Sequence, residues 1–147
     1  MKNILLADDD ADDRAFFEDA LREVKIQTEL TVASDGIELM ATLDENVTVP
    51  PPPHLIFLDL NMPRKNGYEC LREIRQTRKL KDIPVVVFST SDSASAVDAA
   101  YDLGANCYLR KPNSHELLIR SIEAVLGLDL WRHNRQLPKQ EFVIAVA

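Results

Sequence analysis

The chain alternates short apolar runs with segments of helical periodicity, and this alternation constrains its fold more than any other feature. Most of the runs lack the apolar–polar alternation of a half-exposed strand, so we expect strands that are covered on both faces. Between the runs, residues such as Phe17, Leu21 and Val24 fall three and four positions apart, which predicts helices. The predicted strands are residues 3–7, 30–33, 55–58, 85–89 and 107–109.

Five strand–helix units predict parallel strands joined by right-handed crossovers. The expected fold class is therefore α/β: a doubly wound five-stranded parallel sheet in the flavodoxin-like (βα)5 order 2-1-3-4-5, with a C-terminal extension. We expect one domain over residues 1–127 and the extension over 128–147. Asn113, with Glu116 three residues later, predicts the N-cap of the last helix, and Gly127 predicts its end.

Two segments lie outside the strand–helix pattern. Residues 48–53 (TVPPPP) predict an extended linker, with a ligand for a proline-recognition domain as the alternative. The extension ends in the apolar residues 142–146, which would promote aggregation if exposed. We therefore expect it to pack on the domain or on a dimer partner.

Composition excludes several classes of function. The 147 residues carry a net charge of -7, which argues against a nucleic-acid partner because phosphate binding needs a basic face. No apolar run is long enough to cross a membrane, and the N-terminus lacks the features of a signal peptide. Cys70 and Cys107 have neither disulfide-scaffold density nor zinc-site spacing, so we expect buried free thiols in a cytoplasmic protein.

Polar residues follow four of the predicted strands: Asp8 and Asp9, Asp59, Ser89 and Lys111. Because the carboxyl ends of parallel strands share one edge, we expect these side chains to converge there. The carboxylates would repel one another without a divalent cation, Mg²⁺ or alternatively Mn²⁺, and the ammonium of Lys111. A carboxylate nucleophile, a cation, a lysine and a hydroxyl are the groups that phosphoryl transfer requires.

A simpler interpretation is that each acidic residue only caps the helix that follows it. This interpretation suits Asp10, Asp12 and Asp13, which open the first predicted helix. It does not explain why the other residues all follow strands at the same edge of the sheet.

Four motifs together resemble the receiver domain of bacterial two-component response regulators: LLADDD, FLDLNMPRKNG, IPVVVFSTS and GANCYLRKP. The resemblance extends over residues 3–126. It implies a single-domain regulator without a separate output domain. The LDLNMPRKNG and STS variants, the long loop before residue 55 and the extension are similar to the short regulators paired with phytochrome-type sensor histidine kinases.

The resemblance implies a role for each matching residue. Asp59 would be the phosphoacceptor, and Lys111 would pair with the phosphoryl group. Asp8, Asp9, Asp59 and the backbone carbonyl of Asn61 would hold Mg²⁺.

The resemblance also implies roles for four residues in the conformational switch and in the lifetime of the phosphorylated state. Ser89 would move toward the phosphoryl group, and Tyr108 would turn inward behind it. Asn61 and Ser91 would help to set the lifetime of the acyl phosphate.

The implied function is a phosphoacceptor signalling module, not an enzyme beyond self-phosphotransfer and autodephosphorylation. A sensor histidine kinase or a phosphotransfer protein would donate the phosphoryl group, and an unknown downstream protein would receive the signal. A homodimer is one possible assembly. Neither a nucleic acid nor a membrane is an expected partner.

Two other classes of function compete with this one. A Mg²⁺-dependent phosphohydrolase would use Asp59 as nucleophile, but it would want a second carboxylate where Asn61 stands. A flavodoxin-like flavin-binding protein would need a phosphate loop where residues 8–10 are all aspartate.

Overall fold

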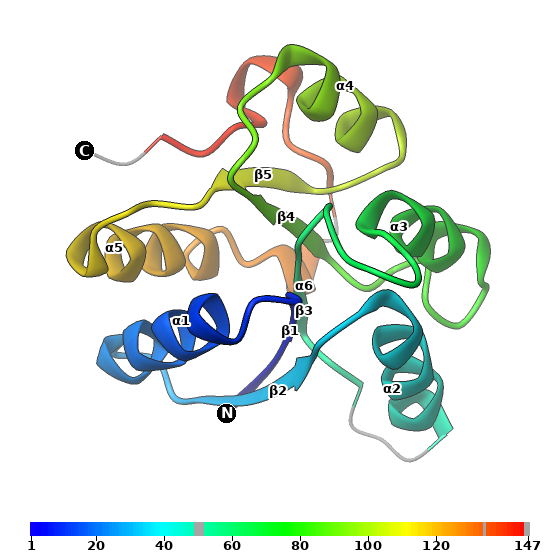
Figure 1. The fold of residues 1–147 in the computed structure, drawn as a ribbon, viewed down its shortest axis with the longest axis horizontal. Helices are drawn as coiled ribbons and strands as arrows, with labels where there is room; N and C mark the ends of the chain where they lie inside the picture. The colour runs from blue at the N-terminus through cyan, green and yellow to red at the C-terminus, as the bar shows by residue number, and fades with distance from the viewer. Residues whose placement is uncertain (49–51, 134, 146–147) are drawn as a thin grey trace.

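The computed structural model describes residues 1–48, 52–133 and 135–145, and Figure 1 shows the alternating order of their strands and helices. None of the helices in these ranges is long and apolar enough to span a bilayer. In chain order the elements are β1 (Lys2–Ala7), α1 (Ala11–Glu23), β2 (Thr28–Ala33), α2 (Gly36–Thr48), β3 (Leu55–Leu58), α3 (Gly67–Gln76), β4 (Val85–Ser89), α4 (Ala94–Asp102), β5 (Cys107–Arg110), α5 (His115–Leu126), α6 (Leu130–His133) and the 3₁₀ helix η1 (Lys139–Glu141).

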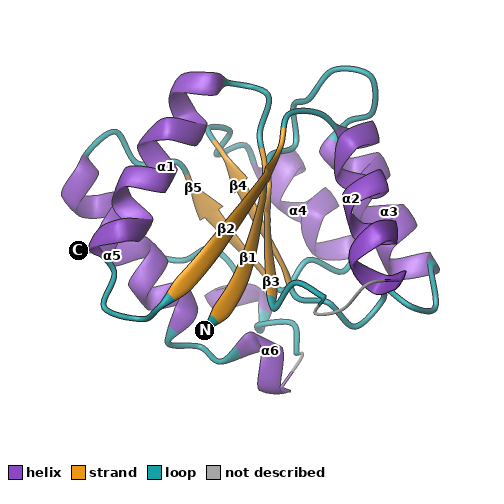
Figure 2. Cartoon of the chain, turned by 90° about the horizontal axis from the view of Figure 1, so that it is seen from below, coloured by secondary structure: helices purple, strands orange, loops and turns teal. Residues whose placement is uncertain are grey.

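The sheet confirms the predicted topology. Its strands are all parallel and lie in the order β2-β1-β3-β4-β5. Strands β3 and β4 have the predicted bounds, and every residue in both is buried, as expected for strands covered on two faces. Figure 2 shows the helices on both sides of the twisted sheet.

Each face of the sheet has its own hydrophobic core. On the face covered by α1 and α5, the rings of Phe17, Phe57 and Phe88 pack edge to face, with centroids 4.9 to 6.2 Å apart. The other face, covered by α2, α3 and α4, buries residues such as Leu71 and Tyr108. The two cores hold the central strands rigidly, so the residues that follow them are fixed at the edge of the sheet.

Two local predictions were wrong. The N-cap of α5 is Ser114 rather than Asn113: the Ser114 hydroxyl accepts a hydrogen bond from the backbone N–H of Leu117 at 3.3 Å. Thr48, predicted to begin an extended linker, is instead the last residue of α2. Helices usually end at or before the residue that precedes a proline, and Pro50 is the first proline after this helix. Residues 49–51 of the predicted linker lie outside the described part of the chain.

The C-terminal extension packs on the domain, which is one of its two predicted locations. Phe142 is fully buried against the rings of Tyr101 and Tyr108. The backbone N–H of Tyr108 donates to Phe142 O at 2.8 Å, and that of Ile144 donates to Tyr108 O at 2.9 Å. The extension thus adds a short parallel pairing, through Val143, to the outer edge of β5.

Candidate functional site

Strand register places the predicted site residues at one edge of the sheet. Ala7 pairs with Leu58, so Asp8 and Asp59 leave neighbouring strands at the same level. The backbone N–H of Asp59 donates to Ala7 O at 2.9 Å, which extends the ladder to the site itself. The backbone N–H of Lys111 likewise donates to the carbonyl of Ser89 at 2.8 Å. The convergence predicted from sequence is confirmed.

The loop after β3 fixes the carboxylate of Asp59. Its Oδ1 atom accepts a hydrogen bond from the backbone N–H of Asn61 at 3.3 Å. A Cβ atom at Gly67 would lie 2.2 Å from the Asp59 carbonyl oxygen, so only glycine lets α3 begin this close to the site. Asn66 and Glu69 then close a capping box at the start of α3.

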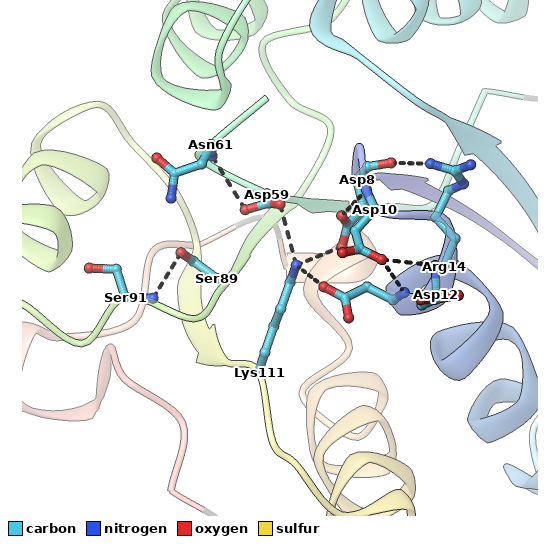
Figure 3. Close-up of polar contacts among 10 residues, drawn as sticks. Asp8, Asp10, Asp12, Arg14, Asp59, Asn61, Ser89, Ser91 and Lys111 are labelled. Atoms are coloured by element: carbon cyan, nitrogen blue, oxygen red, sulfur yellow. Dashed lines mark hydrogen bonds and ion pairs between the residues drawn. The ribbon is translucent and has the colours of Figure 1, made fainter. Parts of the chain in front are cut away.

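Lys111 is the cation at the centre of the site (Figure 3). Its Nζ atom lies 2.7 Å from Asp8 Oδ2, 2.9 Å from Asp13 Oδ2 and 3.3 Å from Asp59 Oδ2. Asp8 Oδ2 is buried and makes no hydrogen bond, so the ion pair with Lys111 is its compensating contact. This arrangement offsets the repulsion among the carboxylates.

The protonation equilibria reflect this crowding. Burial raises the pKa of Asp59 to about 6; the positive charge of Lys111 opposes the shift, and the negative charge of Asp8 adds to it. Burial alone would lower the pKa of Lys111, but its contacts with Asp8, Asp13 and Asp59 hold that pKa above its ordinary value. At neutral pH the site therefore holds an ionised Asp59 carboxylate beside a protonated Lys111 ammonium.

One carboxylate oxygen from each of Asp8, Asp9 and Asp59 lies within 4.8 Å of the other two, as the ligands of one metal ion would. Hard oxygen donors in this number suit Mg²⁺ or Mn²⁺, and the Lys111 ammonium is the present cationic partner of the buried Asp8 Oδ2. The group opens into a cavity of about 550 Å³ that Asn61 and Lys111 also line. The predicted donor set therefore fits a divalent cation, while the role of the Asn61 carbonyl stays a prediction.

The predicted switch residues lie on the β4 side of the site. Ser89 is buried, and its hydroxyl accepts a hydrogen bond from the backbone N–H of Ser91 at 3.2 Å. Tyr108 is also buried, and its hydroxyl donates to Ser91 O at 2.7 Å. Ser91 thus links the site to Tyr108, and Tyr108 in turn contacts the C-terminal extension.

Sequence reasoning missed two residues of the site. Asp10 does cap α1, accepting hydrogen bonds from the backbone N–H groups of Asp12 and Asp13. Asp13, however, also contacts Lys111, and Arg14 Nη1 donates to Asp8 O at 2.8 Å. One sequence signal could have indicated both residues. They lie in the first turn of a helix that begins at this edge of the sheet, and helical side chains point toward the helix N-terminus.

Comparisons with known proteins show the family that this chain resembles. Residues 4–123 match the family model described as the response regulator receiver domain. Response regulator Rcp1 of Synechocystis sp. is 40% identical over 126 residues, covering 84% of this chain and 86% of that protein. The Mn²⁺-bound crystal structure of Rcp1 matches with 38% identity and a TM-score of 0.76, covering 94% of this chain and 99% of that one. The phosphorylated cyanobacterial phytochrome response regulator RcpA matches with 35% identity and a TM-score of 0.78, covering 93% and 98%.

Proposed function

The chain belongs to the response regulator receiver domain family, and we propose that Asp59 is the residue that accepts its phosphoryl group. One observation carries this assignment. Of the three carboxylates suited to a divalent cation, Asp59 both contacts the Lys111 ammonium, at 3.3 Å, and lines the cavity, whereas Asp8 contacts Lys111 but is fully buried. A phosphoryl group on Asp59 would therefore meet positive charge on two sides.

The proposed reaction is a transfer from a phosphohistidine. A carboxylate oxygen of Asp59 forms the new P–O bond while the P–N bond of the donor breaks, and the imidazole nitrogen keeps the electron pair. Lys111 neutralises charge on a phosphoryl oxygen. Asp8, Asp9 and Asp59, with the Asn61 carbonyl as a further ligand, would hold a divalent cation, which would supply positive charge against the remaining charge of the transition state.

The proposed response uses the residues on the β4 side. Ser89 moves toward the phosphoryl group, and because Ser91 O accepts a hydrogen bond from the Tyr108 hydroxyl, that movement alters the surroundings of Tyr108. Asn61 and Ser91 flank the acyl phosphate and set its lifetime. The proposed chemistry is limited to self-phosphotransfer and autodephosphorylation. Residues 1–127 are proposed to act as the receiver domain, with residues 128–147 as its extension.

The proposed donor is a sensor histidine kinase of the phytochrome type, or a phosphotransfer protein between that kinase and this chain. The match to a phytochrome response regulator supports the choice. The proposed compartment is the cytoplasm, where the two free buried thiols would stay reduced. A downstream protein, or a second copy of the chain, would recognise the phosphorylated form. Family membership favours this function over a phosphohydrolase or a flavin-binding protein.

The assignment is tested with a small-molecule donor. Incubation with acetyl phosphate and Mg²⁺ should give a phosphoryl adduct that hydroxylamine removes, as expected of an acyl phosphate. Asp59→Asn should abolish the adduct, because the nucleophile is lost. Asp12→Asn removes an exposed carboxylate of the same cavity and should leave the adduct in place. An adduct that survives Asp59→Asn would assign the phosphorylation to another residue.

A further inference from the structure

Lys111 shares two of its three carboxylate partners with the candidate metal group. Asp8 and Asp59 belong to that group, whereas Asp13 does not. An ammonium has three donor hydrogens, so all three carboxylates can engage it when no cation is bound. In that state Lys111 engages two carboxylates that a cation would need.

A cation and the ammonium therefore compete for the same two carboxylates. The contacts of Lys111 with Asp8 Oδ2 and Asp59 Oδ2 are 2.7 and 3.3 Å long, and like charges brought onto the same carboxylates repel each other. For Asp8 and Asp59 to turn toward a cation, the ammonium must be held elsewhere. Its side chain is only 10% exposed, so withdrawal into bulk water is not readily available.

Asp13 is placed to hold the ammonium. It lies in the first turn of α1, at the edge of the sheet where the site opens, and lines the same cavity as Lys111. Its Oδ2 accepts a hydrogen bond from Lys111 Nζ at 2.9 Å. The Asp13 side chain is 42% exposed whereas that of Asp8 is fully buried, so its carboxylate can adjust as the ammonium moves.

We propose that Asp13 is a positioning residue that retains the Lys111 ammonium while Asp8 and Asp59 bind the divalent cation. Asp13 acts through Lys111 and is not itself a metal ligand. With the ammonium retained, Lys111 stays beside Asp59 instead of opposing the cation. This inference rests on the proposed function in one respect, namely that the cation serves transfer to Asp59.

The test is the affinity for Mg²⁺, measured by calorimetry on the full chain without a phosphoryl donor. Asp13→Asn should weaken Mg²⁺ binding about tenfold, the loss expected for one charge-assisted hydrogen bond. Asp12→Asn is the matched control, because it removes one negative charge from the preceding residue, which lines the same cavity. It should weaken binding only about twofold, as expected for an exposed charge. Equal weakening by the two substitutions would overturn the proposal.

A second comparison separates positioning from simple loss of charge. In a Lys111→Met background no ammonium has to be retained, so Asp13→Asn and Asp12→Asn should have the same small effect. A tenfold effect of Asp13→Asn that persists there would contradict the proposal. Should Lys111→Met fail to fold, Asp13→Glu in the native background decides: binding within about threefold of the wild type supports retention by a carboxylate, and binding as weak as in Asp13→Asn overturns it.

These outcomes are independent of the acetyl phosphate experiment. The Mg²⁺ measurements involve no phosphoryl group, so they can succeed even if the adduct survives Asp59→Asn. In that case the assignment of the phosphoacceptor fails while the role of Asp13 stands.

Discussion

Asp59 shows how a single residue at this site balances function against stability. Only 5% of it is exposed, and burial raises its pKa from 3.8 to about 6. Between these two pH values the folded chain binds more protons than the unfolded chain, so the free energy of unfolding falls as the pH rises through that window. Above pH 6 the full penalty of an ionised buried carboxylate is present. Asp59, the proposed phosphoacceptor, is therefore destabilising at neutral pH.

We predict that Asp59→Asn stabilises the fold in buffer without divalent cations. The free energy of unfolding should rise by about 2 kcal/mol at pH 8 and hardly change at pH 4, where the native carboxyl is already protonated. Urea unfolding followed by circular dichroism measures both values. Asp12→Asn, at an exposed position, should have little effect at either pH. A variant no more stable than the wild type at pH 8 would show that burial does not destabilise Asp59.

At the scale of the elements, the start of α5 tests the assigned helix cap. Both Asn113 and Ser114 are residue types that cap helices, and the spacing from Asn113 to Glu116 favoured the former. In the structure Ser114 has extended backbone angles and a hydroxyl that accepts from the Leu117 N–H, while Asn113 is exposed. The path of the chain from β5 into α5 therefore places Ser114 at the N-cap, although the sequence pattern favoured Asn113.

We predict that Ser114→Ala lowers the free energy of unfolding by about 1 kcal/mol, because the N–H of Leu117 loses its partner. Asn113→Ala is the neighbouring control and should change it by less than about 0.5 kcal/mol. Thermal unfolding of the two variants gives the comparison. A larger loss from Asn113→Ala than from Ser114→Ala would restore Asn113 as the cap.

At the scale of the whole molecule, the C-terminal extension contributes to the hydrophobic cores on both faces of the sheet. Leu130 and Leu137 are buried in the core on the α1 and α5 face, and Phe142 in the core on the opposite face. Lys139 also pairs with Asp98 on α4 at 2.5 Å. The extension therefore joins both cores instead of forming a separate unit, and we expect it to unfold together with the domain.

We predict that Phe142→Ala lowers the free energy of unfolding by about 3 kcal/mol, the usual loss for a large ring removed from a core. Val143→Ala, one residue away at a position 44% exposed, should cost less than about 1 kcal/mol. Hydrogen exchange at the backbone N–H of Tyr108, which donates to Phe142 O, should accelerate only in Phe142→Ala. Similar small losses in both variants would mean that the extension does not contribute to the stability of the domain.

The sequence by itself determined the features that depend on local pattern. The apolar runs predicted β3 and β4 at their observed bounds, and the alternation of strands and helices predicted a doubly wound parallel sheet, whose expected flavodoxin-like order the structure confirms. Because parallel strands end at a common edge, Asp8, Asp59 and Lys111 could be brought together before any coordinates were available. These inferences succeed because periodicity and chain connectivity are readable along the chain.

Only the tertiary structure decided which side chains meet across that edge. Lys111 and Asp13 are 98 positions apart, and their contact depends on how α1 is rotated against the end of β5. The pairing of Val143 with Tyr108 depends in the same way on the free edge of β5 and the space beside α4. Such contacts are set by register, helix rotation and packing volume, which are properties of the assembled fold rather than of any local pattern. The residue type of Asp13 was readable from the sequence, but its position beside Lys111 arises only when the sheet and α1 pack together.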